Sequence, residues 1–128
     1  MGDIKFLDIN AVLDVHDSLV TKYGGLLGIR DVGLLKSAIS QPEASYGGHY
    51  LHDDIFHMAA AYAYHIVKNH AFIDGNKRTG SGIALLFLRL NNFKRQINNK
   101  EWDQIILDIS TNTITKEDVA AYLRKAME

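Results

Sequence analysis

Hydrophobic positions recur at helical spacing along most of the chain. Near the N-terminus, Ile9, Val12, His16 and Val20 fall on one face of a helix that the pattern predicts over about 9–22. The same spacing predicts further helices over about 32–40, 53–67, 76–91, 100–110 and 115–127. Only one proline interrupts the chain. The pattern therefore favours an all-helical fold.

Two of these segments are much more apolar than the others. The segment 53–67 is apolar on nearly every side, which is typical of a helix in the middle of a bundle. A loop over 69–75 joins it to a second apolar helix over 76–91. We expect Gly47 and Gly48 to form a flexible stretch and 93–97 to be briefly extended. The predicted fold class is a compact all-α bundle of about six helices, forming a single domain over residues 1–128.

Local signals mark some helix ends and contacts. Asp31 is expected to cap the short helix over 32–40. Thr115 and Asp118 come close to a capping box, although Glu or Gln usually occupies the second position. Gly80 and Gly82 each cost roughly 1 kcal/mol relative to alanine inside a helix. We infer that both glycines allow close contact with the long helix over 53–67.

Composition narrows the classes of function. The 128 residues include no cysteine, which excludes disulfides, cysteine-based metal sites and a thiol nucleophile. A net charge of −1 leaves no positive excess to hold a nucleic-acid backbone, so nucleic acid is not an expected partner. No apolar run reaches membrane-spanning length, and the N-terminus lacks a signal-peptide pattern. We therefore expect a soluble cytoplasmic protein with no membrane partner.

Polar chemistry concentrates in the segment 70–80, between the two most apolar helices. Gly75 and Asn76 enter a helix, whose first turn presents unpaired N–H groups and a partial positive charge. Lys77 and Arg78 add two cations at that same end, where the partial positive charge of the helix repels them unless an anion binds. A phosphate fits these donors together. The segment is not a P-loop, because Ser81 and the glycine after it replace the required Lys-Ser/Thr pair.

Two further residues of this segment suggest a reaction. Asp74 lies beside the predicted phosphate site, where a carboxylate is repulsive unless a cation such as Mg²⁺ bridges it to the phosphates. His70 precedes the loop and is suited to taking a proton from a hydroxyl nucleophile. A base, a metal ligand and phosphate donors together indicate phosphoryl or nucleotidyl transfer.

The arrangement resembles the Fic/Doc (Fido) family, and most closely its death-on-curing toxin branch. The family signature His-x-Phe-x-Asp/Glu-Gly/Ala-Asn-Gly/Lys-Arg stands complete over 70–78, and further likeness extends over most of the chain. The resemblance implies the family's all-helical fold, His70 as general base, Phe72 as an anchor of the loop and Asp74 as the Mg²⁺ ligand. The residues that it implies for gripping the nucleotide phosphates are Asn76, Lys77 and Arg78, with Gly75 beside them and Thr79 supporting the site.

Within that family, the residue after the asparagine separates two activities. AMP-transferring members usually carry glycine there, whereas this chain has Lys77, which in the toxin branch goes with phosphoryl transfer from ATP. Ser81 stands where AMP-transferring members often have a second arginine. Gly82 replaces a polar residue that toxin-branch members can carry. The resemblance thus implies a kinase that modifies a threonine of translation elongation factor Tu and blocks translation, with AMP transfer as the alternative.

The resemblance also bears on partners. The self-inhibitory Ser/Thr-x-x-x-Glu-Gly/Asn helix of the family is not apparent in this chain. We therefore expect a separate antitoxin that lays an inhibitory segment into a groove, as in a toxin–antitoxin pair.

Two hypotheses from other classes remain. His16 and Asp17 are similar to the doublet of HD-type metal phosphohydrolases, although a histidine on an amphipathic face beside an exposed aspartate is the simpler interpretation. A non-catalytic module that only binds a partner is the other alternative. The chain also has four histidines that could suggest a metal cluster, but structural or surface roles are favoured for them; they are His49, His52, His57 and His65.

Overall fold

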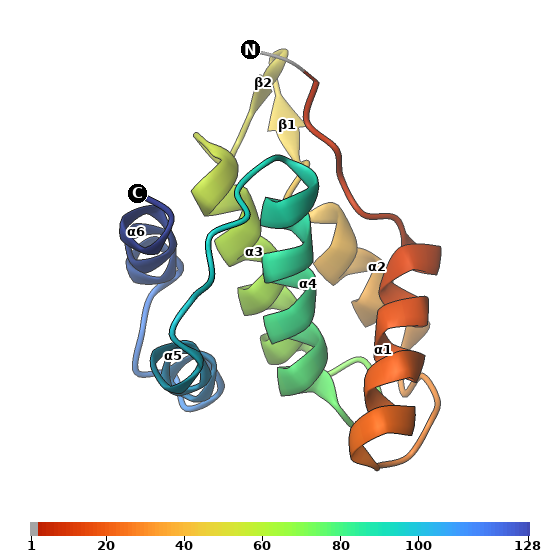
Figure 1. Cartoon of the computed structure of the whole chain (residues 1–128). Helices are drawn as coiled ribbons and strands as arrows, with labels where there is room; N and C mark the ends of the chain where they lie inside the picture. The colour runs from red at the N-terminus through yellow and green to blue at the C-terminus, as the bar shows by residue number, and fades with distance from the viewer. Residues whose placement is uncertain (1–2) are drawn as a thin grey trace.

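Six helices follow one another along residues 3–128, the part of the chain that this computed structural model describes (Figure 1). The number and order of helices agree with the sequence pattern. The elements are α1 (Ile9–Tyr23), α2 (Val32–Ser40), β1 (Ser45–Tyr46), β2 (His49–Tyr50), α3 (Ile55–Asn69), α4 (Asn76–Leu90), α5 (Asn99–Ser110) and α6 (Lys116–Ala126).

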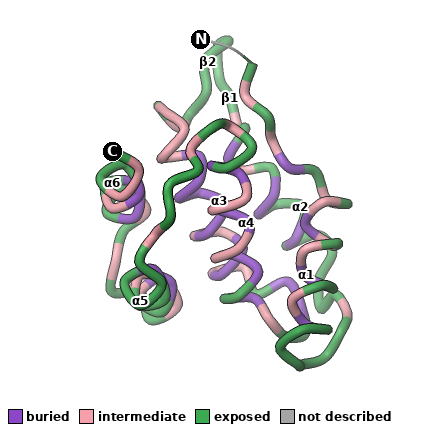
Figure 2. The backbone as a smooth tube through the Cα atoms, viewed as in Figure 1, coloured by how far each residue is buried: buried purple, intermediate pink, exposed green. Residues whose placement is uncertain are grey.

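Helices α3 and α4 form the centre of the molecule. They pack against each other, with α1 and α2 on one side and α5 and α6 on the other (Figure 1). Figure 2 shows that buried positions gather where α3 and α4 face their neighbours. Eight of the fifteen residues of α3 are buried, including Tyr62, which explains why its sequence is apolar on nearly every side. The loop that carries the polar segment 70–75 therefore starts and ends on the two central helices of the core.

The two glycines of α4 differ in what they contact. A Cβ at Gly80 would lie 2.8 Å from Val67 Cγ2 and 3.1 Å from the Ala63 carbonyl oxygen, so Gly80 does allow α4 to approach α3 closely. The same inference is wrong for Gly82, where a Cβ would meet only α1, at 3.6 Å from Leu19 Cδ1 and 3.8 Å from Val15 Cγ1. Because residues two apart point to opposite sides of a helix, the two glycines cannot both face α3.

Most helix starts are fixed by side-chain caps. Asp31 caps α2 as expected, with its carboxylate accepting from Leu34 N at 2.9 Å. At α6, Thr115 Oγ1 accepts from Asp118 N at 3.1 Å, and the Asp118 carboxylate accepts from Thr115 N at 3.4 Å. The capping box is therefore complete with the shorter aspartate in place of glutamate.

One loop expectation needs correction. Gly47 and Gly48 form the turn of a short hairpin, in which β1 pairs antiparallel with β2. Both glycines have positive φ, at 60° and 82°, which is the geometry that a two-residue hairpin turn requires. The segment 93–97 belongs to no helix or strand, and its extended conformation stays a prediction.

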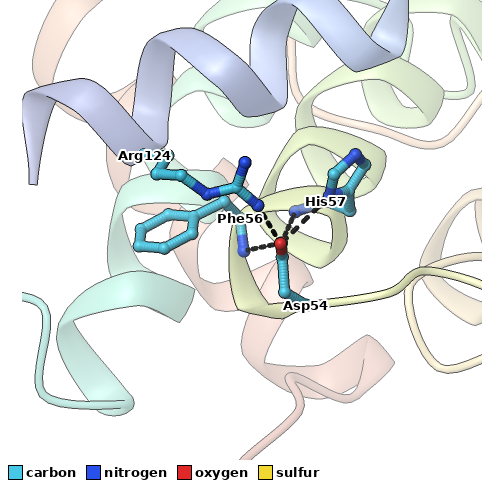
Figure 3. A network of polar contacts seen from close by, with 4 residues as sticks. All are labelled: Asp54, Phe56, His57 and Arg124. Carbon is cyan, nitrogen blue, oxygen red and sulfur yellow. Dashed lines mark hydrogen bonds and ion pairs between the residues drawn. The ribbon is translucent and has the colours of Figure 1, made fainter.

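Helix α6 is held against the start of α3 by a polar cluster around Asp54 (Figure 3). The Asp54 carboxylate accepts from Phe56 N at 3.0 Å, from His57 N at 2.9 Å and from His57 Nδ1 at 3.0 Å, and it pairs with Arg124 of α6. Burial alone would raise the pKa of Asp54, but the hydrogen bonds from His57 and the charge of Arg124 hold it below its usual value.

None of the helices within residues 3–128 is long and apolar enough to cross a membrane.

Candidate active site

His70 ends α3 in an unusual backbone conformation. Its φ of 51° and ψ of 46° lie in the left-handed region, which non-glycine residues rarely adopt. The Arg30 guanidinium supports this conformation, because Nε donates to the His70 carbonyl oxygen at 2.8 Å and Nη2 to the Asn69 carbonyl oxygen at 3.3 Å. The His70 side chain is exposed and borders a cleft, so a ligand or a protein substrate can reach its ring.

The loop after His70 is docked on the segment between α1 and α2. The Ala71 carbonyl oxygen accepts from Arg30 N at 2.7 Å and from Asp31 N at 3.0 Å, and Ile73 N donates to the Gly28 carbonyl oxygen at 3.1 Å. Gly28 has φ 124°, a conformation that side chains rarely adopt, and a Cβ there would also lie 2.8 Å from Ile73 Cδ1, so this position favours glycine. These backbone hydrogen bonds form an isolated antiparallel β-bridge between Ile29 and Phe72, which holds the loop.

Phe72 and Asn76 lock the loop from inside. The Phe72 ring is fully buried, in line with its expected anchoring role. Asn76 is also buried; its Oδ1 accepts from Phe72 N and its Nδ2 donates to the Phe72 carbonyl oxygen, both at 3.0 Å. The side-chain amide that we expected to grip phosphates is thus bonded to the loop backbone. What Asn76 can present to an anion is the N–H group of the first helical turn.

Asp74 carries the only carboxylate of the loop. Its Oδ2 accepts from Leu26 N at 3.1 Å and its Oδ1 from Gly75 N at 2.9 Å, while the residue remains exposed. Gly25 lies against it, where a Cβ would approach Asp74 Oδ2 to 2.8 Å. A fixed, exposed carboxylate of this kind fits Mg²⁺ held by one protein ligand together with phosphate oxygens. It does not fit an all-protein cage, since residues 3–128 hold no group of three metal-binding side chains.

The start of α4 offers positive charge without a competing cap. Gly75 precedes the helix with φ 78°, makes no side-chain cap, and no acidic residue occupies the first turn. Lys77 and Arg78 are both exposed there, and the Arg78 guanidinium stacks on the Tyr23 ring at 4.3 Å. Thr79 is fully buried on the same turn, and its Oγ1 has no hydrogen-bond partner within residues 3–128. Apart from the Gly75 N–H, which donates to Asp74 Oδ1, the N–H groups of this turn and the two cations therefore remain available to an anion.

These groups border a cleft of about 730 Å³, a volume in the range of small-molecule sites. Its walls come from the end of α3, the loop, the start of α4 and one face of α5. The α5 residues of this wall, which the sequence reasoning missed, are Asp103, Ile106, Leu107 and Ser110. Helical periodicity places such residues on a face of α5 but does not say which face borders the site.

His16 is not part of a metal centre. It is buried, its Nε2 donates to the Asp74 carbonyl oxygen at 2.7 Å, and its ring stacks on Phe72 with centroids 3.7 Å apart. The protonated Nε2 has no lone pair for a metal, and residues 3–128 hold no group of three metal-binding side chains that could join Nδ1 in a metal site. Asp17 points to solvent with 65% of its side chain exposed. The HD-type hypothesis is therefore wrong, and the simpler interpretation of a buried histidine beside an exposed aspartate is confirmed.

The four histidines of the suggested metal cluster lie in three different surroundings. His49 is exposed on the hairpin, and His57 belongs to the Asp54 cluster. His52 and His65 contact Lys116 Nζ at 3.2 Å and 2.9 Å. Burial and the nearby Lys116 charge lower the pKa of His65 to about 4, so it accepts from the lysine as a neutral ring. The favoured structural and surface roles describe all four.

Fold and site together define a helical domain with an exposed histidine at the edge of a cleft, opposite the cationic start of a core helix. The sequence profile of the Fic/DOC family matches residues 6–88 of the chain. Protein kinase doc of Escherichia phage P1 is 32% identical over 122 residues, covering 95% of each chain. Toxin Doc of Mycolicibacterium smegmatis is 31% identical over 116 residues, covering 87% of this chain and 89% of that protein. The chain belongs to the Fic/DOC family.

Proposed function

We propose that this protein is a Doc-like toxin kinase, which transfers the γ-phosphoryl group of ATP to a hydroxyl group of a protein substrate. The observation that carries the proposal is the position of His70 and the uncapped, cationic start of α4 on one cleft. The names of the two relatives, a protein kinase and a toxin, agree with it. Because α5 contributes a wall of the cleft, residues 1–128 act as one Fic/Doc domain in this proposal.

The start of α4 binds the phosphates. Lys77 and Arg78 supply the charge, and the N–H groups of the first turn of α4 supply short hydrogen bonds, while the stacked Tyr23 ring limits the motion of Arg78. Gly75, which has no side chain, lets the phosphates approach the backbone. Phe72 and Thr79 support this arrangement from the core. Asp74 would hold Mg²⁺, which neutralises phosphate charge when bound.

His70 performs the proton transfer. Its neutral ring accepts the proton of the substrate hydroxyl as that oxygen forms a bond to the γ-phosphorus of ATP. The bond from the γ-phosphorus to the β–γ bridging oxygen breaks, and ADP leaves with that electron pair. The exposed ring at the cleft edge allows a hydroxyl on another protein to reach it. Loss of a general base of this kind costs roughly 10²–10⁴ in rate.

Labelled ATP separates this proposal from AMP transfer. Purified protein is incubated with a cell lysate and ATP labelled at either the α- or the γ-phosphate, with His70→Ala as the matched control. Because Lys77 follows the asparagine and Ser81 lacks the charge of a second arginine, we expect retained label from the γ position only. Label from the α position only would establish AMP transfer, and no label from either would favour a non-catalytic binding module.

The target and the inhibitor belong to the same proposal. We propose that the substrate is a threonine of translation elongation factor Tu and that an antitoxin protein supplies an inhibitory segment to the site. Expression of the wild-type chain should arrest growth, whereas His70→Ala should not. Arrest by the His70→Ala variant as well would contradict a toxic role for the transfer reaction.

A further inference from the structure

His16 contacts two residues of the active-site loop, Phe72 and Asp74, although it lies on α1, far from the loop in sequence. Its Nε2 is 2.7 Å from the Asp74 carbonyl oxygen, and its ring lies nearly parallel to Phe72, with an interplanar angle of 6°. Only 1% of the residue is exposed. Since a carbonyl oxygen only accepts, Nε2 must carry the proton and donate it. His16 therefore holds the loop through a hydrogen bond of defined direction as well as by packing.

The bond to the Asp74 carbonyl has a geometric consequence. A trans peptide group is planar, and its C=O and N–H bonds point in opposite directions. When His16 fixes the Asp74 carbonyl toward the core, it also fixes the Gly75 N–H on the opposite side, where Gly75 borders the cleft. There the N–H donates to Asp74 Oδ1 at 2.9 Å. One peptide plane thus connects His16 to both an N–H group and the carboxylate of the site.

Gly75 makes this control necessary. It has φ 78° and no Cβ, so the peptide group that precedes it can rotate more easily than one before any other residue. Two hydrogen bonds distinguish the observed orientation of the Asp74–Gly75 peptide from the flipped one: the bond from His16 Nε2 to the Asp74 carbonyl oxygen and the bond from Gly75 N to Asp74 Oδ1. Only the bond from His16 comes from outside the loop.

We infer that His16 is a positioning residue, which orients the Asp74–Gly75 peptide so that the Gly75 N–H holds the Asp74 carboxylate toward the bound phosphates. The inference rests on the proposed function for the identity of the ligand, but not for the orientation of the peptide itself. His16 does not touch the reacting atoms. It acts through the loop.

Two substitutions separate positioning from packing. His16→Phe keeps an aromatic ring against Phe72 but removes the donor, whereas His16→Gln places an amide N–H where Nε2 lies but removes the ring. Val12→Ala, which removes buried packing one turn earlier in α1, serves as the matched control for lost stability. A merely structural role would make the effect of each variant follow its loss of thermal stability.

Calorimetric titrations with Mg-ATP and with pyrophosphate measure the binding effect. We expect His16→Phe to weaken both affinities by about tenfold or more, since one hydrogen bond to a charged group is misdirected. His16→Gln should stay within about threefold of the wild type, by the same reasoning. Equal losses in the two variants, or losses that follow thermal stability as in Val12→Ala, would overturn the inference.

Nuclear magnetic resonance tests the peptide orientation without any ligand. In protein labelled with ¹⁵N-glycine, the Gly75 amide peak should move in His16→Phe and stay in place in His16→Gln. The wild-type ring provides a test that needs no variant to fold: its Nε2 must be the protonated nitrogen. A proton on Nδ1 alone, or an unmoved Gly75 peak in His16→Phe, would refute the role of His16. By contrast, absence of phosphoryl transfer in the wild type would refute only the proposed function.

Discussion

Arg30 offers a test of how His70, the proposed general base, is held, because it contacts the His70 backbone. Arg30→Ala removes the donors to the His70 and Asn69 carbonyl oxygens, at 2.8 Å and 3.3 Å. The left-handed conformation of His70 costs a non-glycine residue roughly 1–2 kcal/mol. Hydrogen bonds from a charged donor are worth about 1.5–3 kcal/mol each, and less at an exposed site such as this one. The two contributions are of similar size.

We therefore expect Arg30→Ala to destabilise the competent conformation of the loop by roughly 1–2 kcal/mol, which corresponds to a five- to thirtyfold fall in the rate of phosphoryl transfer. The rate of Arg30→Lys should lie between those of the wild type and Arg30→Ala, because an ammonium group carries the charge but does not reproduce the planar fork of donors. The assay is the initial rate of γ-phosphate transfer at saturating ATP, measured for each variant.

A double-mutant cycle with His70→Ala makes this prediction specific. If Arg30 acts through His70, its substitution should have almost no further effect on the rate once His70 is alanine. An equal fall in both backgrounds, or an unchanged rate in Arg30→Ala, would refute the reasoning that the guanidinium positions the base.

Three further predictions concern packing, pH and metal. In urea unfolding, Gly80→Ala should destabilise the fold by about 1–3 kcal/mol because its Cβ would lie 2.8 Å from Val67 Cγ2, whereas Gly82→Ala should stabilise it by up to about 1 kcal/mol; the opposite order would contradict the packing of α4. The folded pKa of Asp54 lies below its usual 3.8, so its contribution is present above pH 3.8 and is lost as the pH falls through the folded value. Melting temperatures measured from pH 7 down to about pH 2 should therefore fall less steeply below pH 3.8 for Asp54→Asn, and equal slopes there would contradict this role. Asp74→Asn should raise the Mg²⁺ concentration needed for half-maximal transfer by about tenfold or more, and an unchanged requirement would remove Asp74 as the metal ligand.

The helices were predictable because their signals are local. Asp31 caps α2, and the spacing of Ile9, Val12, His16 and Val20 defines the inner face of α1. The hairpin was not predictable in the same way, because two adjacent glycines suit both a mobile stretch and a tight turn. Which of the two forms depends on whether the flanking residues pair, and that is a tertiary effect.

The site was predictable as a set of residue types but not as a set of contacts. The spacing of the segment 70–78 placed His70 and the cations of α4 at the two ends of one loop, and the structure brings them to one cleft. It could not reveal that the Asn76 amide bonds to the loop backbone, that Arg30 holds His70, or that α5 forms a wall. The contacts of Arg30 and α5 depend on elements distant in sequence, which a local motif does not record. The Asn76 contact is local, but its residue type alone does not say whether the amide faces the backbone or a ligand.

The central claim is that the cleft presents the γ-phosphate of ATP to a hydroxyl group beside His70. The most direct test is the intact mass of elongation factor Tu after incubation with the protein, ATP and Mg²⁺, compared with a reaction containing His70→Ala. We expect a gain of one phosphoryl group, located on a threonine, with the wild-type protein only. A gain of one AMP group, or the same phosphoryl gain with His70→Ala, would contradict the account.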